Sequence, residues 1–112
     1  PQFARFAGND LADVTPRGLQ RALRDGTALV DVRPTDEYAA GHLPGAQSLP
    51  LARLRQDGVP AGAEPLLLYC RGQYCTTAIE GARLLTRGGR AVRRLPFGVA
   101  EWTAAGYGLE RA

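Results

Sequence analysis

The chain has 112 residues, of which 45% are hydrophobic and 22% charged, and this suits one compact domain while leaving no room for two. All 14 basic residues are arginine and the formal net charge is +3, but the arginines are scattered and do not alternate with aromatic residues. We therefore expect a solvated surface and no nucleic-acid platform, and no apolar stretch is long enough to span a membrane.

The first half of the chain predicts a tail, a helix, a strand and a second helix. Residues 1–13 show no helical or strand period and are predicted as a tail or linker, with one domain over 14–112. Thr15-Pro16 is typical of a helix start, and Gly26 of a helix end. The apolar run over 28–32 predicts a buried strand. A short helix capped by Thr35 and stopped at Gly41 follows it.

The rest of the chain continues to alternate. The predicted elements are a brief strand over 46–49, a helical turn over 51–54, a loop over 58–64, a buried strand over 66–69, a helix from 76 that ends at Gly88-Gly89, a strand over 91–95 and a helix over 98–105. In the helix from 76, Ala78, Ala82 and Leu85 form one apolar stripe, with Ile79 beside it. Alternating strands and helices imply crossover connections and a parallel sheet covered on both faces.

Cys70 is the first residue after the predicted strand 66–69, and it therefore lies at the carboxyl end of the sheet, where ligands bind in open parallel sheets. Because a helix begins at Thr76, the loop between can curl around the sulfur with its N–H groups inward. These donors and the helix end favour an anion there and lower the pKa of a thiol. Gly72 permits the turn, and Arg71 adds a positive charge at the rim.

The second cysteine, Cys75, has two interpretations that stay open. It is a resolving thiol that attacks a persulfide or an oxidised Cys70, or it is a small residue that fills the loop wall. A disulfide between the two would close only a small loop and add little stability, so the pair indicates reactive chemistry more than a secreted scaffold. Two cysteines and one distant histidine do not make a four-ligand zinc set, so we expect no metal.

Three segments resemble, in the same order, the motifs of rhodanese domains. D-V-R-P-T-D-E-Y-A-A-G-H-L-P-G-A over 31–46 resembles the signature of the first half, and C-R-G-Q-Y-C over 70–75 resembles the active-site loop that starts with the persulfide-forming cysteine. G-V-A-E-W-T-A-A-G-Y over 98–107 is similar to the closing motif with its tryptophan. The three are collinear and span Val14 to about Leu109. The resemblance implies an α/β, rhodanese-like fold with a five-stranded parallel sheet flanked by helices on both faces.

The activity that the resemblance implies is sulfur transfer. Sulfane sulfur moves from a donor such as thiosulfate or a persulfide to a thiophilic acceptor through a Cys70 persulfide, with no cofactor, so the expected partners are small sulfur-containing anions and thiol acceptors. The implied substrate-binding loop consists of Arg71, Gly72, Gln73, Tyr74, Cys75 and Thr76. Its single arginine leaves the recognition of a doubly charged donor open, and Tyr74 at the loop tip is the best exposed contact.

A loop with a second cysteine is most similar to rhodanese domains fused behind winged-helix repressors of the arsenic-responsive kind. The alternative function is therefore a redox- or persulfide-sensing domain that uses Cys70 and Cys75 beside a fused or associated transcription regulator, without binding nucleic acid or membrane itself. The start at Pro1 and the absence of methionine fit a chain processed or cut from a longer, cytoplasmic protein.

Two further functions are disfavoured. Phosphatases and arsenate reductases of this fold are expected to have a loop in which a cysteine is followed six positions later by an arginine. This chain has Thr76 at that position. A rhodanese-shaped binding domain without chemistry does not need the intact Cys70.

Other polar residues look functional but have a structural interpretation that we favour. Asp31 and Arg33 at a strand end either relay charge to Cys70 or pair with neighbours such as Glu37. His42 lies in a turn sequence and is expected to belong to the scaffold and not to a Cys–His dyad. Trp102 on an alanine-rich helix is expected in the core.

Overall fold

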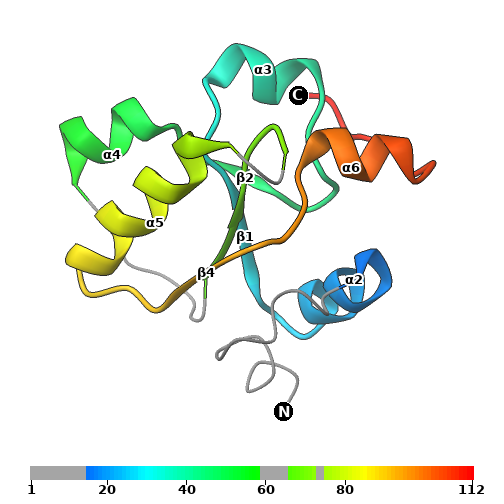
Figure 1. Ribbon diagram of the computed structural model, residues 1–112, viewed down its shortest axis with the longest axis horizontal. Helices are drawn as coiled ribbons and strands as arrows, with labels where there is room; N and C mark the ends of the chain where they lie inside the picture. The colour runs from blue at the N-terminus through cyan, green and yellow to red at the C-terminus, as the bar shows by residue number, and fades with distance from the viewer. Residues whose placement is uncertain (1–14, 59–65, 73–74) are drawn as a thin grey trace.

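A computed structural model of the protein describes residues 15–58, 66–72 and 75–112, in which helices and strands alternate (Figure 1). The elements in chain order are α2 (Pro16–Arg24), β1 (Ala28–Asp31), α3 (Thr35–Ala40), β2 (Gln47–Ser48), α4 (Leu51–Asp57), β3 (Leu66–Tyr69), α5 (Thr76–Arg87), β4 (Val92–Arg94) and α6 (Val99–Ala104). The tail or linker predicted for residues 1–13, and the loop predicted for 58–64 beyond Gly58, lie outside the described residues.

The strands form one parallel sheet in the order β2-β1-β3-β4. In the register, Val30 of β1 lies opposite Gln47 of β2 and Leu68 of β3, and Leu68 in turn lies opposite Arg94 of β4. The family resemblance implied five strands, and the structure corrects this number: over 15–58, 66–72 and 75–112 the sheet has four strands. All four coincide with runs that the sequence pattern predicts, and the described segments carry no fifth apolar run of strand type.

Each face of the sheet is covered by its own pair of helices. Leu29 and Leu67 point toward the face that holds Leu19 of α2 and Trp102 of α6. Their neighbours in the chain point to the opposite face, where Leu54 of α4 and Leu85 of α5 complete a second core. Because β1 and β3 are buried on both faces, they read in the sequence as continuous apolar runs without alternation.

The helix boundaries follow local chemistry. The Thr15 side chain accepts a hydrogen bond from the Gly18 N–H at 3.0 Å, which confirms the predicted cap of α2, and Gly26 takes a φ of 97° just beyond its end. The cap predicted for α3 was wrong by one residue: Pro34, in extended backbone, is the N-cap and Thr35 is already helical. Within the described residues, no helix is both long and apolar enough to cross a membrane.

The helix α5 matches the predicted range but buries a slightly different stripe. Ala78, Gly81 and Leu85 are buried. A Cβ added at Gly81 would lie 3.2 Å from a methyl group of Val32, so the missing side chain lets α5 approach β1 closely. In this orientation of α5, Ile79 is 41% exposed.

Candidate active site around Cys70

Cys70 follows β3 directly and lies at the carboxyl edge of the sheet, as the sequence predicts. Its residue is only 1% exposed and packs with the core on the α4 and α5 side of the sheet. The hydrogen bond from the Val32 N–H to the Tyr69 carbonyl extends the β1–β3 pairing to the residue before Cys70. The sulfur is therefore held at the end of the most buried strand.

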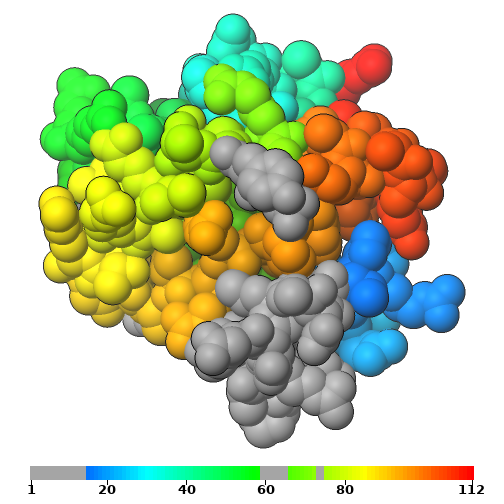
Figure 2. Space-filling view, viewed as in Figure 1, coloured from blue at the N-terminus to red at the C-terminus, as the bar shows by residue number. Residues whose placement is uncertain are grey.

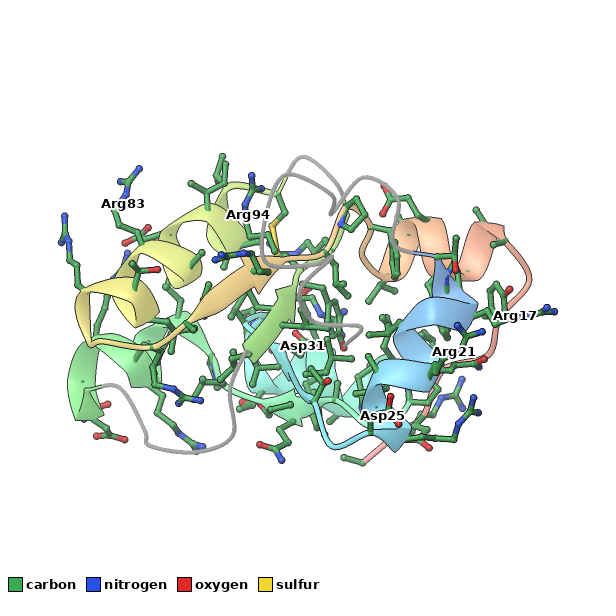
Figure 3. The ribbon with its side chains drawn as sticks, turned by 90° about the horizontal axis from the view of Figure 1, so that it is seen from below. Arg17, Arg21, Asp25, Asp31, Arg83 and Arg94 are labelled. Atoms are coloured by element: carbon green, nitrogen blue, oxygen red, sulfur yellow. A yellow bond between two sulfur atoms is a disulfide. The ribbon has the colours of Figure 1, made fainter. Side chains whose placement is uncertain are left out.

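The two cysteines are joined by a disulfide, with their Cα atoms 6.1 Å apart (the yellow bond in Figure 3). Cys75 is the N-cap residue of α5, and its N–H donates to the Gly72 carbonyl at 3.3 Å. Thr76 is exposed in the first turn of that helix, whereas Gln73 and Tyr74 lie outside the described residues. The close approach that an exchange between the two sulfurs requires is therefore met.

The start of α6 packs against the Cys70 loop. The Val99 N–H donates to the Cys70 carbonyl at 3.3 Å, and the Ala100 N–H donates to the Arg71 carbonyl at 2.9 Å. A Cβ added at Gly98 would lie 2.4 Å from the Cys70 carbonyl oxygen and 2.7 Å from the Gly72 nitrogen. Only glycine leaves room for this approach, so Gly98 is a positioning residue for the loop.

Arg71 does not point freely toward a ligand, because it forms a two-point ion pair with Glu37 of α3. Its Nε donates to one carboxylate oxygen of Glu37 at 2.8 Å and its Nη2 to the other at 2.6 Å. The hydrogen bonds from Arg71 lower the pKa of Glu37, and the same bonds raise the pKa of Arg71. The one basic side chain of the loop is thus balanced by an acidic one.

Beneath the loop lies a buried polar network that ties Tyr69 to β1. Asp31 is fully buried and accepts from the Arg33 Nη2 and from the Tyr69 hydroxyl, both at 2.7 Å. The Tyr69 oxygen accepts from the Leu43 N–H at 3.0 Å. Burial and the Asp31 carboxylate raise the pKa of Tyr69 far above its usual range, so this hydroxyl stays protonated.

These contacts correct one predicted pairing. Asp31 and Arg33 pair with each other, and Glu37, which was named as their neighbour, pairs with Arg71. Arg33 does not pair with Glu37 because its side chain folds back along the end of its own strand, where it also donates to the Gly41 carbonyl at 2.6 Å. Glu37, in the first turn of α3, is left to face the loop.

His42 and Trp102 have contacts that fit scaffold roles. His42 is buried and stacks on the ring of Tyr38 with centroids 3.8 Å apart, and its Nδ1 lies 2.8 Å from the Tyr38 carbonyl oxygen. Its backbone pairs with that of Glu110. Trp102 is buried in the core and donates from Nε1 to the Gly108 carbonyl at 2.8 Å.

The sequence did not predict the contacts through which three residues shape the loop. Gly98, Glu37 and Glu101 act through contacts between elements far apart in the chain. Glu101 accepts a hydrogen bond from the Gly98 N–H at 2.7 Å, and a Cβ added at Gly72 would lie 3.3 Å from its carboxylate. The signal available for Glu101 was its spacing, three residues after a helix start, which is typical of a capping carboxylate.

Comparison with known proteins assigns the chain to a family. The profile of the family described as "Rhodanese-like domain" matches residues 15–105. The chain belongs to this family, and the recognised motifs, fold and Cys70 position agree with that assignment.

Similar proteins include a regulator. The chain is 43% identical over 93 residues to "HTH-type transcriptional regulator Rv0324" of Mycobacterium tuberculosis, covering 82% of this chain and 41% of that protein. It is 32% identical over 96 residues to "Uncharacterized protein slr1261" of a Synechocystis strain, covering 83% of this chain and 52% of that one. The chain thus spans about half the length or less of these curated relatives.

Among solved structures, the solution structure of the rhodanese-like domain of the Alr3790 protein from an Anabaena species has a TM-score of 0.68 and 26% sequence identity. The match covers 86% of this chain and 76% of that one.

Proposed function

We propose that the domain is a sulfurtransferase in which Cys70 carries sulfane sulfur as a persulfide. The observation that carries this proposal is the position of Cys70: directly after a buried parallel strand, at the carboxyl edge of the sheet, on a loop that α6 holds through two backbone hydrogen bonds. A thiol fixed in this way is pre-positioned for attack. Membership of the rhodanese-like family supports the same chemistry.

The proposed cycle has two steps and begins with the dithiol form. The Cys70 thiolate attacks the outer sulfur of a donor R–S–SH; the S–S bond breaks, R–S⁻ leaves, and Cys70–S–SH forms. With thiosulfate the leaving group is sulfite. An acceptor thiolate R′–S⁻ then attacks the outer sulfur of Cys70–S–SH, which yields R′–S–SH and returns the Cys70 thiolate. Added thiol opens the disulfide beforehand and is itself oxidised to R–S–S–R, which fits the reducing, cytoplasmic setting expected for the protein.

The test is turnover of the reduced protein with thiosulfate or a small persulfide as donor and a thiol as acceptor. We expect Cys70→Ser to abolish sulfur transfer while circular dichroism shows an unchanged fold, and Cys75→Ser to keep it, since the loop contacts of Cys70 run through backbone atoms. Loss of turnover in Cys75→Ser alone would contradict this assignment of roles.

A second candidate is a sensory domain, and the observation that favours it is the Cys70–Cys75 disulfide. The Cys75 thiolate attacks the inner sulfur of Cys70–S–SH, the persulfide S–S bond breaks, HS⁻ leaves, and the disulfide forms. A fused or associated regulator then reads the change. The similarity to a transcriptional regulator more than twice the length of the matched region supports this candidate.

The two candidates differ in the lifetime of the persulfide without acceptor. If the sensory route operates, the wild-type persulfide decays with release of sulfide, and the Cys75→Ser persulfide lives longer. Matching decay curves for the two proteins exclude the sensory route and leave sulfur transfer.

A further inference from the structure

A groove of about 460 Å³ lies between α5 and β4, away from the network around Asp31. Figure 2 shows α5 in yellow and β4 in orange side by side on the face turned toward the viewer. The residues that line the groove come from the outer flank of the helix and from the strand, and they are Ile79, Ala82, Arg83, Thr86, Arg87, Val92, Arg93 and Arg94. We call this surface the arginine groove.

The arginine groove carries positive charge. Among the described residues that line it, half are arginines and none is acidic. Glu80, the acidic residue of α5, is engaged on another side of the helix, where it pairs with Arg55 of α4. Arg83 and Arg94 extend on the same side of the molecule (Figure 3). A concave surface that gathers charges of one sign raises the local concentration of an oppositely charged partner.

The arginine groove also offers apolar surface between its charges. Ile79 is 41% exposed and is one of two large hydrophobic residues exposed over 15–58, 66–72 and 75–112. Ala82 of α5 and the largely buried Val92 of β4 also line the arginine groove. A partner that matches both features carries carboxylates around at least one apolar side chain.

One end of the arginine groove lies next to the Cys70 loop. Arg94 lies opposite Leu68 in the β3–β4 register, two residues before Cys70. Ile79 lies one helical turn after Cys75, the N-cap of α5. A segment bound along the arginine groove therefore reaches the loop that carries the proposed persulfide.

We propose that the arginine groove docks an acidic segment of a protein partner that delivers sulfur to Cys70 or receives it. This proposal rests on the proposed sulfur transfer and names the class of its partner: a protein thiol or persulfide next to a stretch of glutamate or aspartate with an interspersed leucine or valine. The arginine charges attract the acidic partner, the leucine or valine side chain of the partner packs on Ile79, and the partner's thiol or persulfide then lies at the Cys70 loop.

The lining favours a protein segment over a nucleic acid. None of the described residues that line the arginine groove is aromatic, so these residues offer bases no stacking surface. The exposed Ile79 is useful to a leucine or valine side chain and not to a phosphate backbone.

The test uses two synthetic peptides of equal length with one cysteine at the end, one with glutamates around a leucine and the other with glutamines in their place. A serine version of each, labelled with fluorescein, reports binding to the reduced full chain by anisotropy. The cysteine versions report the rate at which loaded Cys70 passes its sulfur. We expect the acidic peptide to bind about tenfold more tightly at low salt, with the advantage lost at high salt.

The matched variants remove equal charge in two places. Arg83→Gln with Arg87→Gln and Arg94→Gln should abolish the preference for the acidic peptide. Arg17→Gln with Arg21→Gln and Arg24→Gln, on α2 at the opposite face of the sheet, should keep it, and a small neutral thiol should accept sulfur equally from both variants.

Any of four results would overturn the proposal. The two peptides bind equally, or both triple variants lose the preference for the acidic peptide equally. Alternatively, Ile79→Ser leaves the binding of the acidic peptide unchanged, or a short DNA duplex displaces that peptide at a lower concentration than the unlabelled acidic peptide does. Failure of Cys70 to load from any donor refutes the sulfur-transfer function instead, and the anisotropy result then still decides whether the arginine groove binds acidic segments.

Discussion

At the scale of single residues, the ion pair between Glu37 and Arg71 has consequences for donor choice. The loop Cys70 to Thr76 contains one basic residue, and that residue is held in a two-point ion pair. Both side chains are partly exposed, at 53% for Arg71 and 32% for Glu37, so the pair is screened and can be exchanged for a ligand. The pair therefore reduces the attraction of the site for a dianionic donor without removing it.

The first prediction follows from this pair. Glu37→Gln should raise the loading rate with thiosulfate several-fold and leave the rate with a neutral persulfide unchanged, because it frees the Arg71 charge. Arg71→Ala should lower thiosulfate loading by a similar factor, since one partly screened charge near an anion contributes about 1 kcal/mol. The control is Glu80→Gln, which removes a surface pair on α5 and should change neither rate. Equal changes for both donors would mean that Arg71 shapes the loop and does not attract the anion.

The second prediction concerns the buried network. Asp31→Ala leaves the Arg33 guanidinium buried without its carboxylate, and should lower the free energy of unfolding by about 3–5 kcal/mol. Tyr69→Phe removes the acceptor of the Leu43 N–H and should cost about 1–3 kcal/mol. Urea unfolding measures both. A loss below about 0.5 kcal/mol for Tyr69→Phe would show that water replaces its hydroxyl.

At the scale of elements, the active loop is a contact between three of them. β3 delivers Cys70, α5 begins at the residue after Cys75, and the first turn of α6 binds the loop carbonyls. The loop geometry thus depends on a residue, Gly98, that lies 28 positions after Cys70 in the chain. Any side chain at that position pushes α6 and the loop apart.

The third prediction tests this contact with two glycines. Gly98→Ala places a methyl group against the Cys70 carbonyl and should destabilise the fold by about 1–3 kcal/mol and slow Cys70 loading. Gly108→Ala is the matched control, because a Cβ at Gly108 meets nothing within 4 Å. Thermal unfolding and the loading rate are compared in the two variants. An unchanged loading rate in a folded Gly98→Ala protein would show that α6 supports stability alone.

The elements themselves were largely readable from the sequence, because their causes are local. The cap at Thr15, the apolar runs of β1 and β3 and the stripe of α5 each depend on neighbouring residues. The residue pairs that shape the site could not be predicted from local patterns, because Glu37 contacts Arg71 and Gly98 contacts Cys70 only after the chain has folded. The fifth strand came from resemblance alone and had no apolar run to support it in the described residues.

At the scale of the whole molecule, the fold changes the meaning of the charge distribution. The arginines are scattered along the chain, yet the packing of β4 beside α5 collects four of them in the arginine groove. The spacing of Arg83 and Arg87, four positions apart on one helix, was a local signal of a shared face. The contribution of β4 required the sheet order, which composition does not contain.

The whole domain therefore presents a buried, loop-held cysteine at one edge of the sheet and a basic groove that leads to it. A sulfur carrier and a sulfur sensor both need Cys70 to accept a sulfur atom, and they differ only in what removes it. The persulfide on Cys70 is the central claim on which both proposed functions rest.

The most direct test of that claim is the intact mass of the reduced protein after exposure to thiosulfate and, separately, to a small persulfide, followed by mapping of the modified peptide. We predict a gain of about 32 Da, one sulfur atom, on Cys70 in the wild type and in Cys75→Ser, and no gain in Cys70→Ser. A gain that persists in Cys70→Ser would make Cys75 the nucleophile, and no gain with either donor would contradict the account.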